Sequence, residues 1–258
     1  MNQTIQTMLS RKSIRKYTAK EPTNEVIETV VRSGQQAPFA SQLGSILLSR
    51  SRKDHPFNAP LLFTICVDAH KLELIMDRRD WKMFADDLML LIMGMQDAAL
   101  MAENMVIAAE SVGMGSCFLG AAPFRARKII EQYKLPSRVF PMVQLAMGYP
   151  AEDPPPRPRY PMEFVLFEDS YPVFSQHEVQ AAMEQMDQGY LKQHYYHNLN
   201  AMIKLTGERH ETYSYKDYSW SEHISRKWGQ QYFPNTLLQQ IEICGFKISR
   251  NKETEPFE

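Results

Sequence analysis

One long apolar helix most constrains the fold that this chain can adopt. Between Asp86 and Gly113 the polar residues recur at steps of about seven, which keeps them on one narrow stripe of a helix. They are Asp86/Asp87, Gln96/Asp97, Glu103/Asn104 and Glu110. The rest of the helix surface is apolar. We therefore expect a central helix that is buried on nearly all sides.

The most apolar part of this helix, Leu88 to Met95, is too short for a membrane span, which needs about 20 apolar residues. The N-terminus also lacks the continuous apolar segment of a signal peptide. We therefore expect a soluble, cytoplasmic protein without a membrane partner. The cysteines have no metal-binding spacing and lie in apolar sequence, as buried reduced thiols do; they are Cys66, Cys117 and Cys244.

The rest of the pattern predicts a protein of mixed helices and strands. Apolar runs that are typical of strands occupy residues 46–49, 59–68, 113–120, 138–147 and 162–169. Helical spacing occupies residues 4–9, 23–34 and 124–133. Because the strands do not strictly alternate with helices, the sequence favours an α+β or mixed α/β fold.

The character of the chain changes after Tyr171. Residues 176–205 are polar and helical in pattern, and the C-terminal third has too few apolar residues to build a second core easily. The sequence thus predicts a core of residues 1–172 and a helical extension, residues 173–258, that packs on the core or on a partner.

Several kinds of site are disfavoured. The formal net charge is −1, so no overall field attracts nucleic acid, and any anion affinity must be local. The glycines of residues 113–120 do not follow a strand, as a dinucleotide-binding fingerprint requires. His194 and His197 lack a third ligand, so we expect no metal site.

Two cationic clusters remain. Arg11, Ser13 and Arg15 are spaced i, i+2, i+4, and an extended chain places all three on one face. Two guanidinium groups and a hydroxyl make a good phosphate site. The second cluster, Arg157 and Arg159, lies in a segment that prolines hold extended. Solvated arginines in a linker are the alternative for this second pair.

Four segments in this order resemble the FMN-dependent nitroreductase family. They are RKSIRKYTAKEP, QQAPFASQ, AAESVGMGSCFLG and RPRYP. The resemblance runs from about residue 4 to about residue 172 and returns weakly at YSWSEHI; it is strongest to the oxygen-insensitive NADPH nitroreductase and flavin reductase branch. It implies an α+β fold with a central, mostly antiparallel sheet flanked by helices. It also implies an intertwined homodimer with FMN at the interface.

The resemblance also implies the cofactor-binding residues. Arg11, Lys12, Ser13 and Arg15 match the phosphate and ribityl motif, and Arg157 and Arg159 match a Lys-Pro-Arg element with Arg in the Lys place. The loop Pro38, Phe39, Ala40, Ser41 and Gln42 would touch the flavin or its ribityl chain, and Gly120 and Ala121 would offer backbone to its ring. Gly44 and Pro123 depart from the family pattern, as does the tail loop 205–219.

By the same resemblance the protein is an NAD(P)H-dependent FMN oxidoreductase. Flavin N5 carries the chemistry, so no catalytic side chain is expected. Hydride passes from NAD(P)H through FMN to nitroaromatics, quinones or free flavin by a ping-pong mechanism. The alternatives are other flavin chemistry on the same fold, namely reductive dehalogenation or flavin fragmentation, and flavin binding without catalysis. The choice between NADH and NADPH stays open.

Overall fold

The computed structural model describes residues 2–230 and 237–248, which form two compact units. The first unit holds residues 2–154 together with 237–248, and the second holds residues 155–230. The chain therefore leaves the first unit after Pro154 and returns to it near its C-terminus. The assignment of residues 1–172 to a cofactor-binding core and of 173–258 to an extension stays a prediction.

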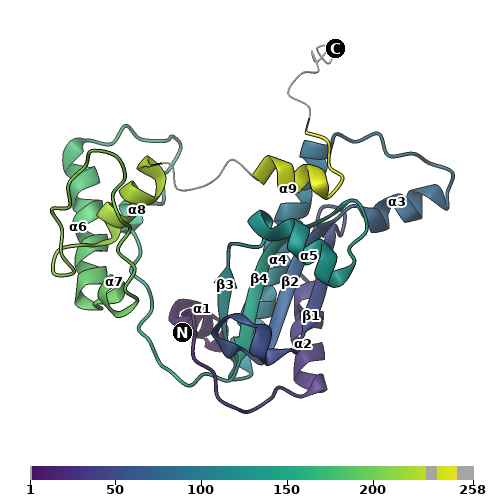
Figure 1. The fold of residues 1–258 in the computed structure, drawn as a ribbon, viewed down its shortest axis with the longest axis horizontal. Coiled ribbons are helices and arrows are strands. Elements are labelled where there is room, and N and C mark those ends of the chain that lie inside the picture. Colours follow the sequence, from purple (N-terminus) through teal and green to yellow (C-terminus); the bar gives the residue numbers. More distant parts are fainter. Residues whose placement is uncertain (1, 231–236, 249–258) are drawn as a thin grey trace, which may run out of the picture. The chain divides into compact units, whose positions relative to one another are not determined.

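A four-stranded antiparallel sheet is the framework of the first unit (Figure 1). Its strands are β1 (Gly44–Ser49), β2 (Leu61–Asp68), β3 (Gly115–Leu119) and β4 (Val139–Gly148). Their order across the sheet is β1-β2-β4-β3, and every neighbouring pair is antiparallel. The sequence-based prediction of an α+β fold with an antiparallel sheet is confirmed.

Helices surround this sheet. In the first unit they are α1 (Gln3–Ser10), α2 (Asn24–Gln35), α3 (His70–Asp77), α4 (Asp87–Ser111), α5 (Ala126–Tyr133) and α9 (Leu237–Ile243), with short 3₁₀ turns at Arg52–Asp54, Pro56–Asn58 and Pro123–Arg125. Side-chain caps begin three of them: Asn2 accepts a hydrogen bond from the N–H of Ile5, Thr23 accepts from that of Val26, and Asp86 accepts from the first turn of α4. Such caps satisfy N–H groups that have no partner within the helix.

The main core lies between the sheet and the helices α2 and α4. Phe63 and Ile65 of β2, Leu145 of β4 and Met105 of α4 are completely buried there. Burying side chains of this size stabilises the fold by roughly 1.5–3 kcal/mol each relative to leaving them exposed. The core therefore fixes α4 against the sheet along most of its length.

The helix α4 has two different faces. Residues including Leu91, Gly94 and Ala98 are buried against the sheet, and Gly94 is required there because a Cβ would lie 2.3 Å from Val67. The opposite face is apolar but exposed: Leu88, Met89, Ile92, Met95 and Leu100 are 37–52% exposed. The prediction of burial on nearly all sides is therefore wrong within one chain, because one sheet covers only one side of a helix.

Among the described residues, α4 is also the one helix long and apolar enough to cross a membrane. Length and apolar composition are shared by core helices of soluble folds. Because its buried face packs into the main core, α4 serves here as the core helix of the first unit.

The C-terminal segment completes the first unit. Cys244 and Phe246, both 1% exposed, pack with Val67, Leu91 and Phe140 in a second cluster. Arg138 ties this segment to the helices. Its guanidinium donates to Glu73 at 2.8 Å and Asp87 at 2.5 Å, while its N–H donates to the carbonyl of Cys244 at 2.7 Å.

The second unit is built from α6 (Gln176–Lys192), α7 (Tyr195–Asn198) and α8 (Trp220–Gly229). Arg226, 2% exposed, sits at its centre, where Glu211 and Glu222 bind its guanidinium. The expected helix over 176–205 is thus confirmed only as far as residue 198. The expected strand over 162–169 is wrong: the segment forms a 3₁₀ turn, Met162–Phe164, followed by irregular backbone. Phe164 and Phe167 pack on Phe174.

Candidate functional site

The cationic segment that follows α1 runs extended along the sheet edge. Ser13 pairs with Ser116 of β3 in a parallel bridge, and Tyr17 pairs with Pro150. Ile14 is 3% exposed and lies so close to Gly115 that a Cβ there would be 2.4 Å from it. With Ile14 fixed inward, the flanking residues Ser13 and Arg15 turn to the other side, as alternation in an extended chain requires.

Three side chains of this segment gather around Cys117 of β3. Burial raises the pKa of the Cys117 thiol, while Arg15, Ser13 and Arg11 act in the opposite direction. The structure therefore brings Arg11, Ser13 and Arg15 to one place, as their spacing predicts. Lys12 turns away and pairs with Asp153.

One of these side chains is incompletely satisfied. Nη1 of Arg11 is buried and has no hydrogen-bond partner among the described residues. Burying a polar group without a partner costs free energy, and such cases in native proteins call for a ligand, ion or water. An anionic group beside Ser13 and Arg15 would satisfy it, so these residues fit the phosphate of a ligand such as FMN.

Two carboxylates, those of Glu152 and Glu110, lie next to the cationic segment. Oε1 of Glu152 accepts the N–H groups of Arg15 at 2.5 Å and Lys16 at 3.1 Å. Glu110, at the end of α4, lies near Arg11, and burial raises the pKa of its carboxyl to about 6. Glu152 therefore fixes the backbone of this segment, and Glu110 lies beside the Arg11 side chain.

This arrangement predicts opposite effects of two substitutions at Glu152. Glu152→Ala removes the acceptor of both N–H groups, and we expect it to raise the Kd of FMN by about tenfold, because hydrogen bonds to charged groups contribute about 1.5–3 kcal/mol. Glu152→Gln keeps an acceptor oxygen and removes a charge that repels phosphate, so its Kd should stay equal or fall. Fluorescence titration with FMN measures both; tighter binding by both variants would contradict the ordering role.

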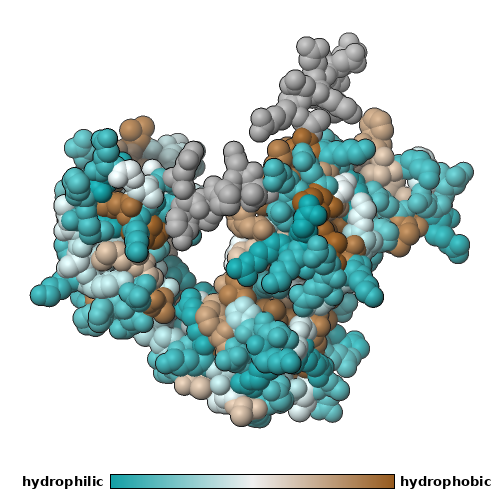
Figure 2. Space-filling view, in the orientation of Figure 1, coloured by the Kyte–Doolittle hydropathy of each residue, from teal (hydrophilic) through white to brown (hydrophobic). Residues whose placement is uncertain are grey.

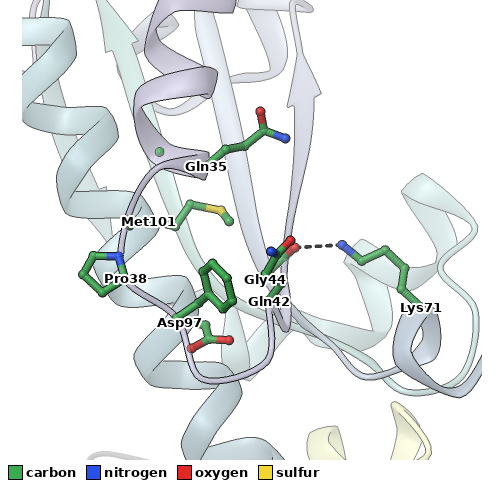
Figure 3. A pocket seen from close by; sticks show the side chains of 10 residues that line it. Gln35, Pro38, Gln42, Gly44, Lys71, Asp97 and Met101 are labelled. Carbon is green, nitrogen blue, oxygen red and sulfur yellow. Dashed lines mark hydrogen bonds between the residues drawn. The ribbon is translucent and has the colours of Figure 1, made fainter. Parts of the chain in front are cut away.

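The loop after α2 forms the second part of the candidate site (Figure 3). Pro38 to Gln42 are exposed, whereas Ala37 and Leu43 at the ends of the loop are buried. Beside it lies a cavity of about 110 Å³, which Phe39, Gln42, Asp97 and Lys71 help to line. Lys71, from the start of α3, donates to the carbonyl of Gly44 at 2.9 Å.

Gly120 and Ala121 lie in an exposed turn directly after β3. Nothing would contact a Cβ at Gly120 within 4 Å, so packing does not require glycine there. This leaves open space beside the backbone of the turn. Its predicted role beside the flavin ring stays a prediction.

Arg157 and Arg159 belong to the second unit. The Arg157 guanidinium stacks 3.6 Å from the ring centre of Tyr195 and donates to Gln193 at 3.0 Å. Arg159 donates to the backbone carbonyls of Arg157 and Pro158, both at 3.1 Å. Arg157 is therefore packed rather than freely solvated, and the role of both arginines at the phosphate stays a prediction.

Sequence reasoning missed the residues that hold these segments in place. Asp97 accepts hydrogen bonds from the loop after α2, and Glu152 from the cationic segment. The sequence carried one signal for Asp97, an acid in the middle of an apolar helix. It carried none for Glu152, which lies beside Asp153 in a proline-rich segment.

The arginine cluster at this sheet edge, with Nη1 of Arg11 unsatisfied among the described residues, is suited to binding a phosphate group. Comparisons with known proteins show to which family the chain is similar. The sequence profile of the Nitroreductase family matches residues 48–149. The FMN reductase (NADPH) of Bacillus subtilis is 33% identical over 189 residues, 67% of this chain and 76% of the relative.

Two longer matches agree. The NADPH-flavin oxidoreductase of Vibrio harveyi is 26% identical over 92% of this chain and 95% of its own. The solved structure of the NfrA1 nitroreductase from Bacillus subtilis has a TM-score of 0.79 at 27% identity, covering 94% of this chain and 98% of that one. The chain belongs to the nitroreductase family, which confirms the family predicted from its sequence.

Proposed function

We propose that the protein is an FMN-dependent oxidoreductase that uses NAD(P)H to reduce nitroaromatics, quinones or free flavin. The observation that carries this proposal is the buried Nη1 of Arg11 beside Ser13 and Arg15, which has no hydrogen-bond partner in the described part of the chain, in a member of the nitroreductase family. The relatives' names, FMN reductase and NADPH-flavin oxidoreductase, agree with FMN as cofactor and NAD(P)H as co-substrate. This is the activity and cofactor set predicted from the sequence.

The chain's own residues bind and orient in this scheme. Arg11, Ser13 and Arg15 hold the cofactor phosphate, and the loop of residues 38–42 borders the flavin. When bound, FMN would supply the redox chemistry, the transfer of a hydride from NAD(P)H to an acceptor in two half-reactions of ping-pong order. Because the cofactor carries that chemistry, the protein contributes positioning and electrostatics, and no side chain needs to act as nucleophile.

Cofactor binding is tested directly by reconstitution. We expect the purified protein to be yellow, or to become so with added FMN, and to bind one FMN per chain. Absorbance near the flavin band and equilibrium dialysis measure the stoichiometry. A colourless protein that takes up no FMN would refute the proposal, and FMN binding without reduction by NADH or NADPH would favour flavin storage over catalysis.

We further propose that the protein is a cytoplasmic homodimer, as the family resemblance implies. The apolar, exposed face of α4 supports a second copy, because contiguous apolar surface on a protein marks an interaction site. Hydrophobic areas lie between hydrophilic ones over the first unit (Figure 2). Dimerisation would bury Met89 and Ile92, which are 52% and 42% exposed in one chain.

A single charge on this face should separate the copies. We expect light scattering to give twice the chain mass for the wild type and the chain mass for Ile92→Glu, because burying an unpaired carboxylate costs several kcal/mol. Lys53→Glu, on an exposed 3₁₀ turn, is the matched control and should remain dimeric. A dimeric Ile92→Glu variant would place the interface elsewhere.

A further inference from the structure

The buried carboxylate of Asp97, in the middle of α4, accepts hydrogen bonds from the loop after α2. Asp97 is 3% exposed. Oδ1 accepts the N–H of Ala40 at 2.6 Å, and Oδ2 accepts the N–H groups of Ser41 at 3.3 Å and Leu43 at 2.9 Å. The three N–H groups therefore converge on one side chain, which lies inside the curve of the loop (Figure 3).

The burial of the Asp97 carboxylate has a free-energy cost that its hydrogen bonds must offset. A buried carboxylate carries a desolvation penalty of several kcal/mol unless hydrogen bonds or an opposite charge offset it. Among the described residues, the hydrogen-bond donors to Asp97 are all backbone N–H groups of this loop. The hydrogen bonds that satisfy the carboxylate of Asp97 thus depend on the present shape of the loop.

The loop in turn needs such a restraint. Gln42 has φ of +52°, a left-handed conformation that is uncommon for a residue with a Cβ and persists only when its surroundings impose it. It lies between Ser41 and Leu43, both of which donate to Asp97. The carboxylate therefore fixes a backbone conformation that a glutamine residue disfavours.

The hydrogen bonds to Asp97 fix the backbone of the loop, and this orients the side chains that the loop exposes. The backbone N–H groups of Ala40 and Ser41 donate to Asp97. The residues Phe39, Ser41 and Gln42 are nevertheless exposed to solvent. Phe39 and Gln42 line the adjoining cavity. A loop on rigid support presents these groups in one geometry, which lowers the entropic cost of binding a ligand against it.

We propose that Asp97 is a positioning residue for flavin binding: through three backbone hydrogen bonds it holds residues 38–43 in the conformation that meets FMN. The inference rests on the proposed function. It assigns to Asp97 the task of preorganising the loop of residues 38–43, through its hydrogen bonds to that loop.

The test compares Asp97→Asn and Asp97→Ala with the wild type. Asparagine has nearly the same volume as aspartate. Its NH₂ group, however, is a donor and cannot accept a hydrogen bond from the N–H groups of the loop. We expect the Kd of FMN to rise by about tenfold or more in both variants, a loss of about 1.4 kcal/mol. Hydrogen exchange in the flavin-free proteins should show faster exchange at Ala40, Ser41 and Leu43. At saturating FMN, one FMN per chain should still bind and kcat should stay within about twofold of the wild type.

Chemical rescue separates positioning from general destabilisation. Formate can occupy the space left by the missing carboxylate in Asp97→Ala and accept the same N–H groups, so it should lower the Kd of FMN there and leave the wild type unchanged. Asp86→Asn is the matched control: it removes an acid from the same helix, and its side-chain oxygen still caps the first turn. Its Kd should equal that of the wild type.

The outcomes distinguish the two proposals. If the wild type binds FMN and Asp97→Asn binds it equally well, the positioning role is wrong while the proposed function stands. The role is also wrong if the variants lose FMN stoichiometry at unchanged Kd, or if formate has no effect. If the wild type itself binds no FMN, the proposed function fails first and the inference fails with it.

Discussion

Replacing Arg11 with alanine should raise the Kd of FMN by about 10- to 100-fold, because hydrogen bonds to charged groups contribute about 1.5–3 kcal/mol. Within residues 2–230 and 237–248, no group accepts a hydrogen bond from the buried Nη1 of Arg11, so this nitrogen can donate to the phosphate. The nearby Glu110 would then face the phosphate with less compensation. Fluorescence titration with FMN measures the change.

Two further substitutions serve as comparisons for Arg11→Ala. Lys16→Ala changes a cation of the same run that is exposed, and it should leave the Kd unchanged. Arg15→Ala combined with Arg159→Ala tests whether both cationic clusters reach the phosphate; an effect equal to that of Arg15→Ala alone would remove Arg159 from the site. Equal affinity in Arg11→Ala and the wild type would show that the unpartnered guanidinium serves another purpose.

Replacing Arg138 with methionine should cause the largest loss of stability. Its guanidinium, in a side chain that is 11% exposed, pairs with Glu73 and with Asp87, the latter 13% exposed. Methionine keeps most of the apolar stem but leaves two carboxylates without their cation. Removing one partner of a buried ion pair costs about 3–5 kcal/mol, which lowers Tm by roughly 10 °C in a chain of this size.

A surface ion pair supplies the control for this substitution. Arg32 pairs with Glu28 on α2, and both side chains are more than half exposed, at 74% and 62%. Arg32→Met should therefore change the free energy of unfolding by less than about 1 kcal/mol. Circular dichroism melting of both variants without flavin decides the point. Equal Tm shifts would mean that the Arg138 network does not anchor the C-terminal segment.

The sequence predicted the elements of the first unit well because their signals are local. The apolar run of residues 59–68 becomes the fully buried β2, and the caps and spacing of residues 23–34 produce α2. The segment 162–169 has the same local signal as a strand. It forms none because a strand also needs a neighbouring edge to pair with, and no local pattern reports whether one is available.

The candidate site shows the same division. The spacing of Arg11, Ser13 and Arg15 foretold their common face, because alternation is a property of any extended chain. The role of Asp97 depends on donors more than 50 positions away in the sequence. Likewise, the exposed apolar face of α4 could not be told from its buried face, since both carry the same kinds of residue.

The most direct test of the account is an anaerobic stopped-flow experiment on the FMN-loaded protein. Flavin absorbance is followed after mixing with NADH or NADPH, and again after adding a nitroaromatic acceptor. We expect at least one nucleotide to bleach the flavin and the acceptor to restore its absorbance in a separate second step. Flavin that binds at one per chain, yet is bleached by neither nucleotide, would contradict the assignment of this protein as an oxidoreductase.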